Sequence, residues 1–361
     1  MRINTTGSGF VGRMAFAYLG LALGCFAAQL SESSMSSALL AARPVIDAYF
    51  LPSGYGWIVA SDGRREFLFT TLDNGGHWSK ESLNLPLAAI SFVNEKRGFG
   101  VVIAGKDFSL FGTENGGQDW KRLCIIPGLS SDNTVLTSLV LSGADTAWIL
   151  GSQPGGLSTV VQIDTTKCSF KKPFSRSSSF GLARAIFGDR KSGELWLVGN
   201  DSVFYSRDLG NSWKPQISRS TLREATSFNA GVALGNGTAL VVGAGVEGTV
   251  YRTMDHGLHW DLVATSPGSH WFRDIYFWDL AHGCAVGASP GLFCTGDGGN
   301  TWETREVLPR LKQSTDSVFT KIAFVNGGRR GWALASGGFI FQTDDAGNSW
   351  QPLDLFSVAQ Q

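Results

Sequence analysis

The sequence predicts an all-β protein, a seven-bladed β-propeller built from four-stranded antiparallel blades with Asp-box hairpins. Three observations predict this fold. A turn motif that ends in tryptophan recurs at a nearly constant spacing, glycine and aromatic residues are abundant, and helix-forming runs are few. The chain has 361 residues, and a repeat fold of that length needs no second core because each unit packs mainly on its neighbours.

The N-terminus has the layout of a secretory signal. Arg2 and Arg13 accompany a polar start, an apolar stretch covers 14–23, and small residues follow. The stretch is too short for a comfortable transmembrane helix. We therefore expect the chain to be exported, to the periplasm or beyond it.

The predicted domains follow from this boundary: a signal peptide over 1–28, a Ser/Ala-rich leader over 29–43 and the propeller over 44–361. Cleavage at Cys25 with lipidation, or an uncleaved anchor, remain alternatives to ordinary cleavage.

The repeat is a turn of eight residues, here called the Asp box, which starts with Thr or Ser and ends with Trp. Its tryptophans are separated by 42, 93, 47, 42 and 48 residues. The six copies carry Asp73, Asn115, Asp208, Asp255, Asp297 and Asp345 at the acidic position, and Trp78, Trp120, Trp213, Trp260, Trp302 and Trp350 at the end. The gap of 93 is two periods, so a seventh, decayed copy is expected at 164–170 with Phe170 in place of tryptophan.

Strand-like segments surround every box. A first strand ends in Phe, as at Phe92 and Phe324, and a second opens near Gly-Trp, as at Trp57 and Trp332. A glycine turn leads to a third strand, and the box turns into a fourth. Four such strands and their turns use about 45 residues, which matches a propeller blade. The last blade has a fourth strand of its own from Trp350 to Leu355, so the ring is expected to close without an exchanged strand.

The Asp box has a structural explanation. Its carboxylate accepts backbone N–H bonds across a tight hairpin, its second glycine supplies a positive φ, and the tryptophan packs back over the turn. A calcium ligand or catalytic carboxylate in each box is the alternative, and the repetition in six copies favours architecture.

The cysteines outside the signal are Cys124, Cys168, Cys284 and Cys294, an even number in an oxidising compartment. Cys284 and Cys294 flank a strand–turn–strand that places them opposite each other, which predicts a disulfide. Cys124 follows the predicted outer strand of the second blade, and Cys168 lies in the decayed copy. A bond between these two would join adjacent blades.

These motifs resemble the Asp-box, or bacterial neuraminidase, repeat superfamily and more closely the photosystem II stability/assembly factor family of seven-bladed propellers. The blades from Phe324 to Trp350 and from His282 to Trp302 match that family's pattern well. The resemblance implies a lumenal or periplasmic scaffold that helps to assemble a membrane protein complex, without catalysis and without a cofactor.

An enzyme on the same fold is the competing hypothesis. Sialidases need three arginines, a Tyr–Glu nucleophile pair and a Phe/Tyr-Arg-Ile-Pro signature, and the nearest string here, Phe272–Ile275, lacks the proline. Another glycosidase with two carboxylates, or a lectin-like glycan binder, leaves no sequence trace and stays open.

Two further motifs have simple structural explanations. The string from Gly243 to Gly248 matches a dinucleotide fingerprint, but a strand follows it instead of the required helix, so we expect a hairpin. His256 and His259 lie in a variable part of the fifth box without a third ligand, so we predict no metal site.

A basic patch is the predicted interaction site. The chain carries 30 basic and 30 acidic residues, so no global field attracts nucleic acid. The loops between first and second strands nevertheless carry three basic pairs at one structural position, with His282 at that position in the sixth blade. These candidate partner-binding residues are Lys96, Arg97, Arg190, Lys191, Arg329 and Arg330. They suggest an acidic protein partner, although solvated loops also need charge.

The mouth of the central channel is the alternative site, because the aromatic strand from Trp271 to Trp278 has rings that it can expose there. We expect a monomer that binds a protein partner, with a glycan as the alternative ligand.

Overall fold

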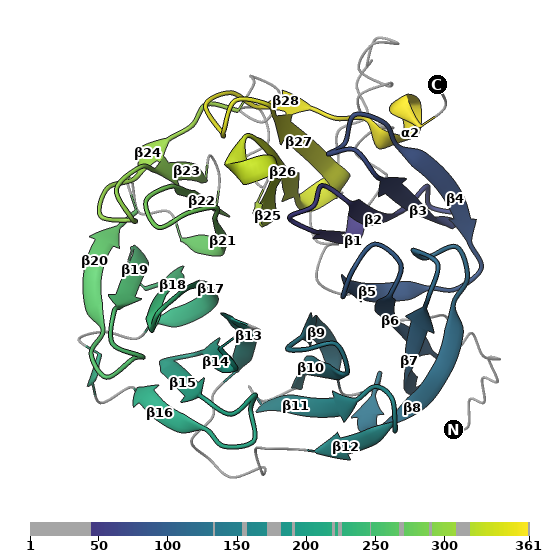
Figure 1. The fold of residues 1–361 in the computed structure, drawn as a ribbon, viewed down its shortest axis with the longest axis horizontal. Coiled ribbons are helices and arrows are strands. Elements are labelled where there is room, and N and C mark those ends of the chain that lie inside the picture. The colour runs from purple at the N-terminus through teal and green to yellow at the C-terminus, as the bar shows by residue number, and fades with distance from the viewer. Residues whose placement is uncertain are drawn as a thin grey trace, which may run out of the picture.

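The computed structural model describes residues 45–132, 134–153, 157–171, 182–189, 192–218, 221–222, 226–245, 247–266, 271–288, 291–307 and 318–359. Seven four-stranded antiparallel sheets form a ring (Figure 1), and the region around the axis of that ring is here called the channel. The predicted seven-bladed propeller is confirmed, including the blade that carries the decayed copy.

Each blade is one contiguous segment whose first strand lines the channel and whose fourth strand lies outermost (Figure 1). Blade 1 comprises β1 Val45–Phe50, β2 Gly56–Ser61, β3 Glu66–Thr71 and β4 Ser79–Leu83, and blade 2 comprises β5 Leu87–Phe92, β6 Gly98–Ala104, β7 Asp107–Thr113 and β8 Lys121–Ser130. Blade 3 comprises β9 Val135–Leu141, β10 Thr146–Gln153, β11 Leu157–Asp164 and β12 Ser169–Lys171, and blade 4 comprises β13 Ala183–Asp189, β14 Glu194–Gly199, β15 Ser202–Ser206 and β16 Lys214–Ile217.

Blade 5 comprises β17 Ser227–Gly235, β18 Thr238–Ala244, β19 Gly248–Thr253 and β20 Asp261–Thr265, and blade 6 comprises β21 Phe272–Phe277, β22 Gly283–Gly287, β23 Leu292–Thr295 and β24 Glu303–Thr304. Blade 7 comprises β25 Phe319–Val325, η2 Asn326–Gly328, β26 Arg330–Ala335, η3 Ser336–Gly338, β27 Phe339–Thr343 and β28 Gln351–Pro352. The helix α2 Leu355–Val358 follows. The predicted hairpin at the glycine string is confirmed, since β18 and β19 flank it.

The ring closes without strand exchange, as predicted, because blades 1 and 7 each supply four strands. The prediction that the last strand reaches Leu355 is wrong. The side chain of Asp354 accepts a hydrogen bond from the N–H of Phe356 and starts α2 instead. The ring of Phe356 then packs edge-on against Phe67 and Phe69 of blade 1, so α2 covers the seam between the first and last blades.

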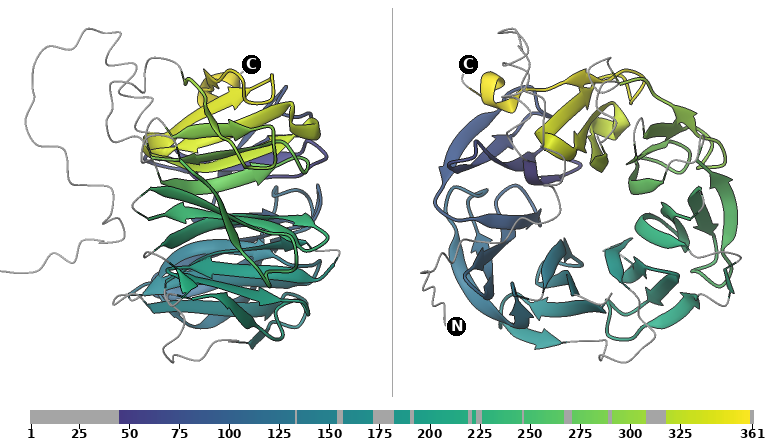
Figure 2. Two further views of the ribbon diagram at one scale, coloured as in Figure 1. Left: turned by 90° about the vertical axis from the view of Figure 1, so that its left-hand side faces the viewer. Right: turned by 180° about the vertical axis from the view of Figure 1, so that it is seen from behind.

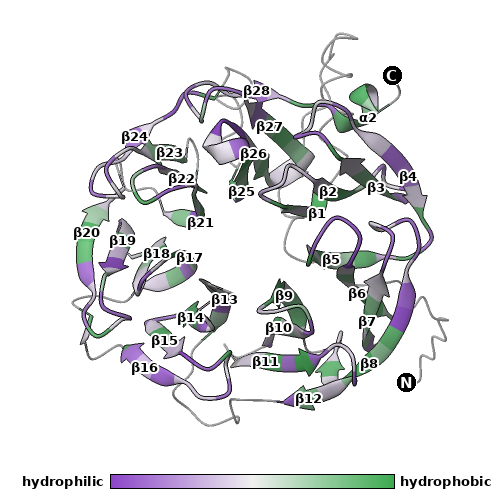
Figure 3. Ribbon diagram, viewed as in Figure 1, coloured by the Kyte–Doolittle hydropathy of each residue, from purple (hydrophilic) through white to green (hydrophobic). Residues whose placement is uncertain are grey.

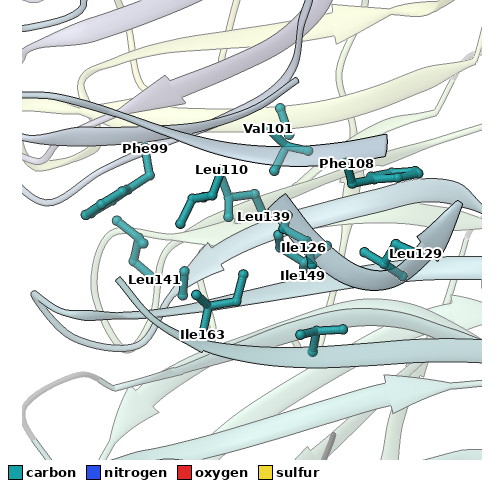
Figure 4. Packing of buried hydrophobic residues seen from close by; sticks show 13 residues of the cluster. Phe99, Val101, Phe108, Leu110, Ile126, Leu129, Leu139, Leu141, Ile149 and Ile163 are labelled. Atoms are coloured by element: carbon teal, nitrogen blue, oxygen red, sulfur yellow. The ribbon is translucent and has the colours of Figure 1, made fainter. Parts of the chain in front are cut away.

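The core lies between neighbouring sheets, and Figure 4 shows the cluster between blades 2 and 3. It contains Phe99, Val101, Phe108, Leu110, Ile126, Leu129, Leu139, Leu141, Ile149 and Ile163 among its members. The outer strands β4 and β16 are hydrophilic by contrast, because they face water (Figure 3). The stability of each blade therefore depends on burying apolar side chains against both neighbours.

Both predicted disulfides are present. Cys284 and Cys294 are directly paired across β22 and β23. Cys124 and Cys168 join blades 2 and 3. Cys124 lies within β8, whereas the sequence had placed it after that strand. The second bond fastens the one blade whose Asp box has decayed.

The hydrogen bonds of the Asp boxes follow the predicted chemistry. Asp297 Oδ1 accepts from the hydroxyl of Thr295 at 2.8 Å and from the N–H of Thr301 at 2.9 Å. Gly299 has a φ of +89°, and its carbonyl accepts from the Trp302 indole at 3.0 Å. Asn115 accepts the same two kinds of bond in blade 2.

Every blade also ties this outer turn to the loop between its first two strands. In each blade one turn N–H donates to a carbonyl of that loop. The seven pairs are Asn74 to Gly54, Gly116 to Lys96, Thr165 to Asp145, Leu209 to Gly193, His256 to Gly237, Gly298 to Ala281 and Ala346 to Arg329. Both sets of loops therefore lie on one face of the disc, here called the Asp-box face. The loops between second and third strands lie on the other face, called the mouth face (Figure 2).

Candidate functional site

The predicted basic loops lie on the Asp-box face, and most of their charge is paired. Arg97 forms ion pairs with Asp145 at 2.9 Å and with Glu114 at 3.5 Å. Arg330 pairs with Asp344 at 2.8 Å. These carboxylates belong to the neighbouring turns and neutralise both arginines. Lys96 and Arg329 form no ion pair among the residues that the structure describes.

The structure does not bring these basic loops together. Lys96 and Arg97 lie in blade 2 and Arg329 and Arg330 in blade 7, with blade 1 between them. Arg190 and Lys191 lie outside the described residues. The role of the patch in partner binding stays a prediction.

The channel wall offers a second candidate site. The first strand of nearly every blade has a β-bulge close to the mouth face, where two residues oppose one on the second strand. A bulge re-aims the extra side chain. Arg184 occupies this position in blade 4, Asn229 in blade 5 and Arg273 in blade 6.

Arg184 and Arg273, here called the channel arginine pair, have no ion-pair partner among the described residues. Arg184 reaches only the amide oxygen of Asn200, at 3.4 and 3.5 Å, and Arg273 stacks 4.6 Å from the ring centre of Trp271. Desolvation lowers the pKa of both guanidinium groups, and the positive charge of Arg184 lowers that of Arg273 further. Two close cations without an anion form a site that attracts a carboxylate or phosphate.

The other side of the channel carries paired charges. Lys321 Nζ contacts Asp47 Oδ1 at 2.6 Å and joins the first strands of blades 7 and 1. Desolvation lowers the pKa of Lys321, but attraction to Asp47 and Asp274 outweighs it, so the net shift is upward. Asp274 accepts the N–H of Ile322 at 2.9 Å, and desolvation raises its pKa to about 6. The channel is therefore cationic at blades 4 to 6 and internally neutralised at blades 6, 7 and 1.

A Tyr–Glu pair exists, but its environment does not suit catalysis. The hydroxyl of Tyr205 donates to Glu194 at 2.6 Å, and His256 Nδ1 contacts the same carboxylate oxygen across the seam between blades 4 and 5. Desolvation and the bond to Glu194 raise the pKa of Tyr205, which weakens it as a nucleophile. Tyr205 is also buried. We interpret this cluster as a bridge between blades.

The remaining histidine motif pairs with its own turn. His259 Nδ1 contacts Asp255 at 2.6 Å and does not join His256. Among the described residues no group of His, Cys, Asp and Glu side chains is arranged to hold a metal ion. No helix in the described part of the chain has the length and hydropathy needed to cross a membrane.

The channel arginine pair was not predicted from the sequence. Arg184 lies three residues before Phe187, whereas Arg273 lies four residues before Phe277, so an alignment on Phe does not bring the two arginines together. They share a position only as the extra residue of the β-bulge. Only the closed ring shows that this position faces a shared channel.

Comparisons with known proteins agree with this geometry. Residues 256–358 match the family model described as Photosynthesis system II assembly factor YCF48. The chain is 25% identical over 294 residues to the Photosystem II assembly lipoprotein Ycf48 of Synechococcus sp. (strain CC9902), covering 77% of this chain and 79% of that protein. The chain is thus similar to photosystem II assembly factors.

Other assembly factors resemble it as well. A 77-residue segment is 30% identical to the chloroplastic Photosystem II stability/assembly factor HCF136 of Oryza sativa subsp. japonica, and covers 21% of this chain and 18% of that protein. The solved structure titled YCF48 bound to D1 peptide superposes with a TM-score of 0.60 at 18% identity, over 84% of this chain and 93% of that one. YCF48 from Cyanidioschyzon merolae gives 0.59 at 18% identity, over 83% and 95%. These structures share the propeller fold of this chain.

Proposed function

We propose that this propeller is an exported, non-catalytic scaffold that assists the assembly or stability of a membrane protein complex. It holds an extended, anionic segment of one subunit at the mouth of the channel. The channel arginine pair is the observation that carries this proposal, because two partly desolvated cations without an anion are stabilised by a carboxylate from outside.

The comparisons support the scaffold role. The relatives are named as assembly and stability factors, and one related structure is titled as a peptide complex. Export to an oxidising compartment is consistent with the two disulfides. The Synechococcus relative is called a lipoprotein, which supports the alternative that this chain is exported and then lipidated at Cys25.

The first-loop cations are the competing contact surface for the same function. Lys96 and Arg329 form no ion pair with another described residue on the Asp-box face, whereas Arg97 and Arg330 are neutralised. The channel arginine pair is favoured because the charge of Arg184 acts on Arg273 and both groups are partly desolvated, which strengthens each contact with an anion.

Capture of the partner from detergent-solubilised host membranes tests the proposal. The double variant Arg184→Gln with Arg273→Gln is expected to reduce capture of one membrane complex at least tenfold, since each charge-assisted bond contributes roughly 1–2 kcal/mol and two are lost. Lys96→Gln with Arg329→Gln removes the same charge from the opposite face and serves as the control.

The melting temperature of both double variants should stay within a few degrees of the parent, so that lost capture is not lost folding. If capture falls only in the control variant, the Asp-box face is the contact surface. If the purified protein turns over glycans, the scaffold proposal fails and a hydrolase on this fold replaces it.

A further inference from the structure

The seam between blades 6 and 7 contains a cavity of about 230 Å³ on the Asp-box face. Trp278 and His282 of the first loop of blade 6, Glu303 and Arg305 at its outer edge, and Ala346 and Asn348 of the seventh Asp box line it. The rings of Trp278 and His282 are stacked at an angle of 11° and form one wall.

At four other seams a side chain bridges the two blades. A side chain of one blade donates a hydrogen bond to the carbonyl of the residue after the acidic position in the next Asp box. The bridges are Trp57 to Gly116 at 2.8 Å, Gln162 to Leu209 at 3.2 Å, Gln216 to His256 at 2.6 Å and Arg252 to Gly298 at 3.4 Å.

The equivalent carbonyl at this seam belongs to Ala346, and no described side chain donates to it. Strand register shows why. In blade 6, Glu303 pairs with Cys294, and in blade 4, Lys214 takes the same place opposite Tyr205. Counting two residues onward in each outer strand, Arg305 of blade 6 corresponds to Gln216 of blade 4. Arg305 instead binds Glu303 through Nη1 at 2.9 Å.

Two further differences from the other blades leave the cavity between blades 6 and 7 open. Cys294 occupies the strand position from which Gln162 and Arg252 reach across at other seams, and the disulfide with Cys284 holds it back. Ala346 replaces the larger His256 of blade 5 at the same box position. The Nε atom of Arg305 is buried and has no hydrogen-bond partner among the residues that the structure describes.

We propose that this cavity binds the side-chain amide of a glutamine or asparagine carried by an extended segment of the partner. The amide supplies what the seam lacks, an acceptor for Arg305 Nε and a donor for the Ala346 carbonyl, as the amide of Gln216 does between blades 4 and 5. The flat Trp278–His282 wall suits a planar group.

A carboxylate fits this cavity less well than an amide. Glu303 lines the cavity and already binds Arg305, and the carboxylates of Asp297 and Asp345 lie in the two adjoining Asp boxes. A further negative charge is repelled there, whereas a neutral amide is not. The cavity thus differs in preference from the channel arginine pair, which attracts anions. This inference rests on the proposed function, since it assumes a protein partner.

An NMR titration tests the cavity without the partner. The probe is an acetylated, amidated tripeptide with glutamine between two glycines, and the signal is the indole N–H of Trp278, assigned with a Trp278→Phe variant. We expect saturable binding in the millimolar range and at least threefold weaker binding when glutamate or phenylalanine replaces glutamine. Equal or tighter binding of either replacement, or no shift up to about 20 mM, overturns the proposal.

Two variants make the test independent of folding defects. Ala346→His introduces the side chain that blade 5 carries at the same left-handed position, with φ values of 59° and 60°, and should abolish the shift. In Arg305→Gln, the new glutamine should donate to the Ala346 carbonyl, as Gln216 does to the carbonyl of His256. The variant should therefore melt about 2 °C higher and show no peptide-induced shift of the Trp278 signal. A variant that melts no higher and still binds the peptide contradicts the proposal. The titration uses no partner protein, so a failed titration does not contradict the proposed scaffold function. Likewise, a failed capture experiment does not contradict binding of the peptide to the cavity.

Discussion

At the scale of single residues, the Asp box shows how little chemistry is needed to repeat a blade. One carboxylate accepts the N–H and hydroxyl bonds of the turn, and desolvation is outweighed by these bonds, which lower the pKa of Asp297 to about 2. The role is structural because Asn115 performs it in blade 2 without a charge. The acidic side chain therefore stabilises the turn mainly by accepting hydrogen bonds, and its charge is less important.

This gives a prediction for Asp297. Replacement by Asn should lower the free energy of unfolding by less than about 1 kcal/mol, because the Oδ1 acceptor remains, whereas Ala should cost about 2 kcal/mol by leaving Thr301 N–H and the Thr295 hydroxyl without acceptors. Urea denaturation of both variants measures the difference. Equal losses for Asn and Ala would show that the charge matters more than the hydrogen bonds.

Individual residues also show what sequence alone predicts. The Asp boxes and the Cys284–Cys294 disulfide follow from local spacing, because turn geometry and hairpin register are short-range properties, whereas Cys124–Cys168 was predicted from the order of neighbouring blades. The ion pairs of Arg97 and Arg330 involve carboxylates on other loops, so sequence suggested free cations where the structure has paired ones. The channel arginine pair depends on two blades that meet only after closure.

At the scale of elements, the first strands do more than line the channel. Asp47 accepts the N–H of Ile90 in blade 2, and Asp274 accepts that of Ile322 in blade 7, so carboxylates fasten neighbouring first strands to each other. Lys321 joins the two carboxylates electrostatically across the closing seam. Sequence periodicity predicts these strands but not the contacts between them, since both bonds cross from one blade to another.

The raised pKa of Asp274 predicts a specific pH dependence. Its folded pKa of about 6 exceeds the ordinary value of 3.8, so the folded state binds more protons between these values and stability falls as pH rises through them. We expect this group to remove about 1–2 kcal/mol of the free energy of unfolding between pH 4 and 6.5.

The Asp274→Asn variant separates this effect from the Asp boxes. Their lowered pKa values make stability fall as pH drops below about 4, which is the opposite direction. The free energy of unfolding of Asp274→Asn minus that of the parent should therefore increase from pH 4 to 6.5. A difference that does not change with pH would show that the carboxyl titrates normally in the folded protein.

The end of the chain shows a limit of pattern reading at the same scale. The last strand is only two residues long, and α2 has four residues, too few for a helical period to appear in the sequence. Its position is set by Phe356 packing on blade 1, a contact between opposite ends of the chain. Closure of the ring was predicted correctly, whereas the helix that covers the seam was not.

At the scale of the whole molecule, the two faces of the disc have different properties. The Asp-box face carries paired charges, braced turns and the amide-binding cavity between blades 6 and 7. The mouth face carries the channel arginine pair, which has no ion-pair partner among the described residues and attracts anions. We propose that a scaffold with these two surfaces binds an anionic partner segment at the channel and a neutral side chain in the cavity between blades 6 and 7.

Site-specific photo-crosslinking within blade 5 tests this account most directly. A photoreactive residue at Glu247 lies on the mouth face, and one at Met254 lies on the Asp-box face of the same blade, both exposed. Incubated with solubilised host membranes, the Glu247 position should crosslink to a membrane-complex subunit, and Arg184→Gln with Arg273→Gln should abolish the product. Crosslinking from Met254 alone, or a Glu247 product that persists in the double variant, would contradict the channel mouth as the partner site.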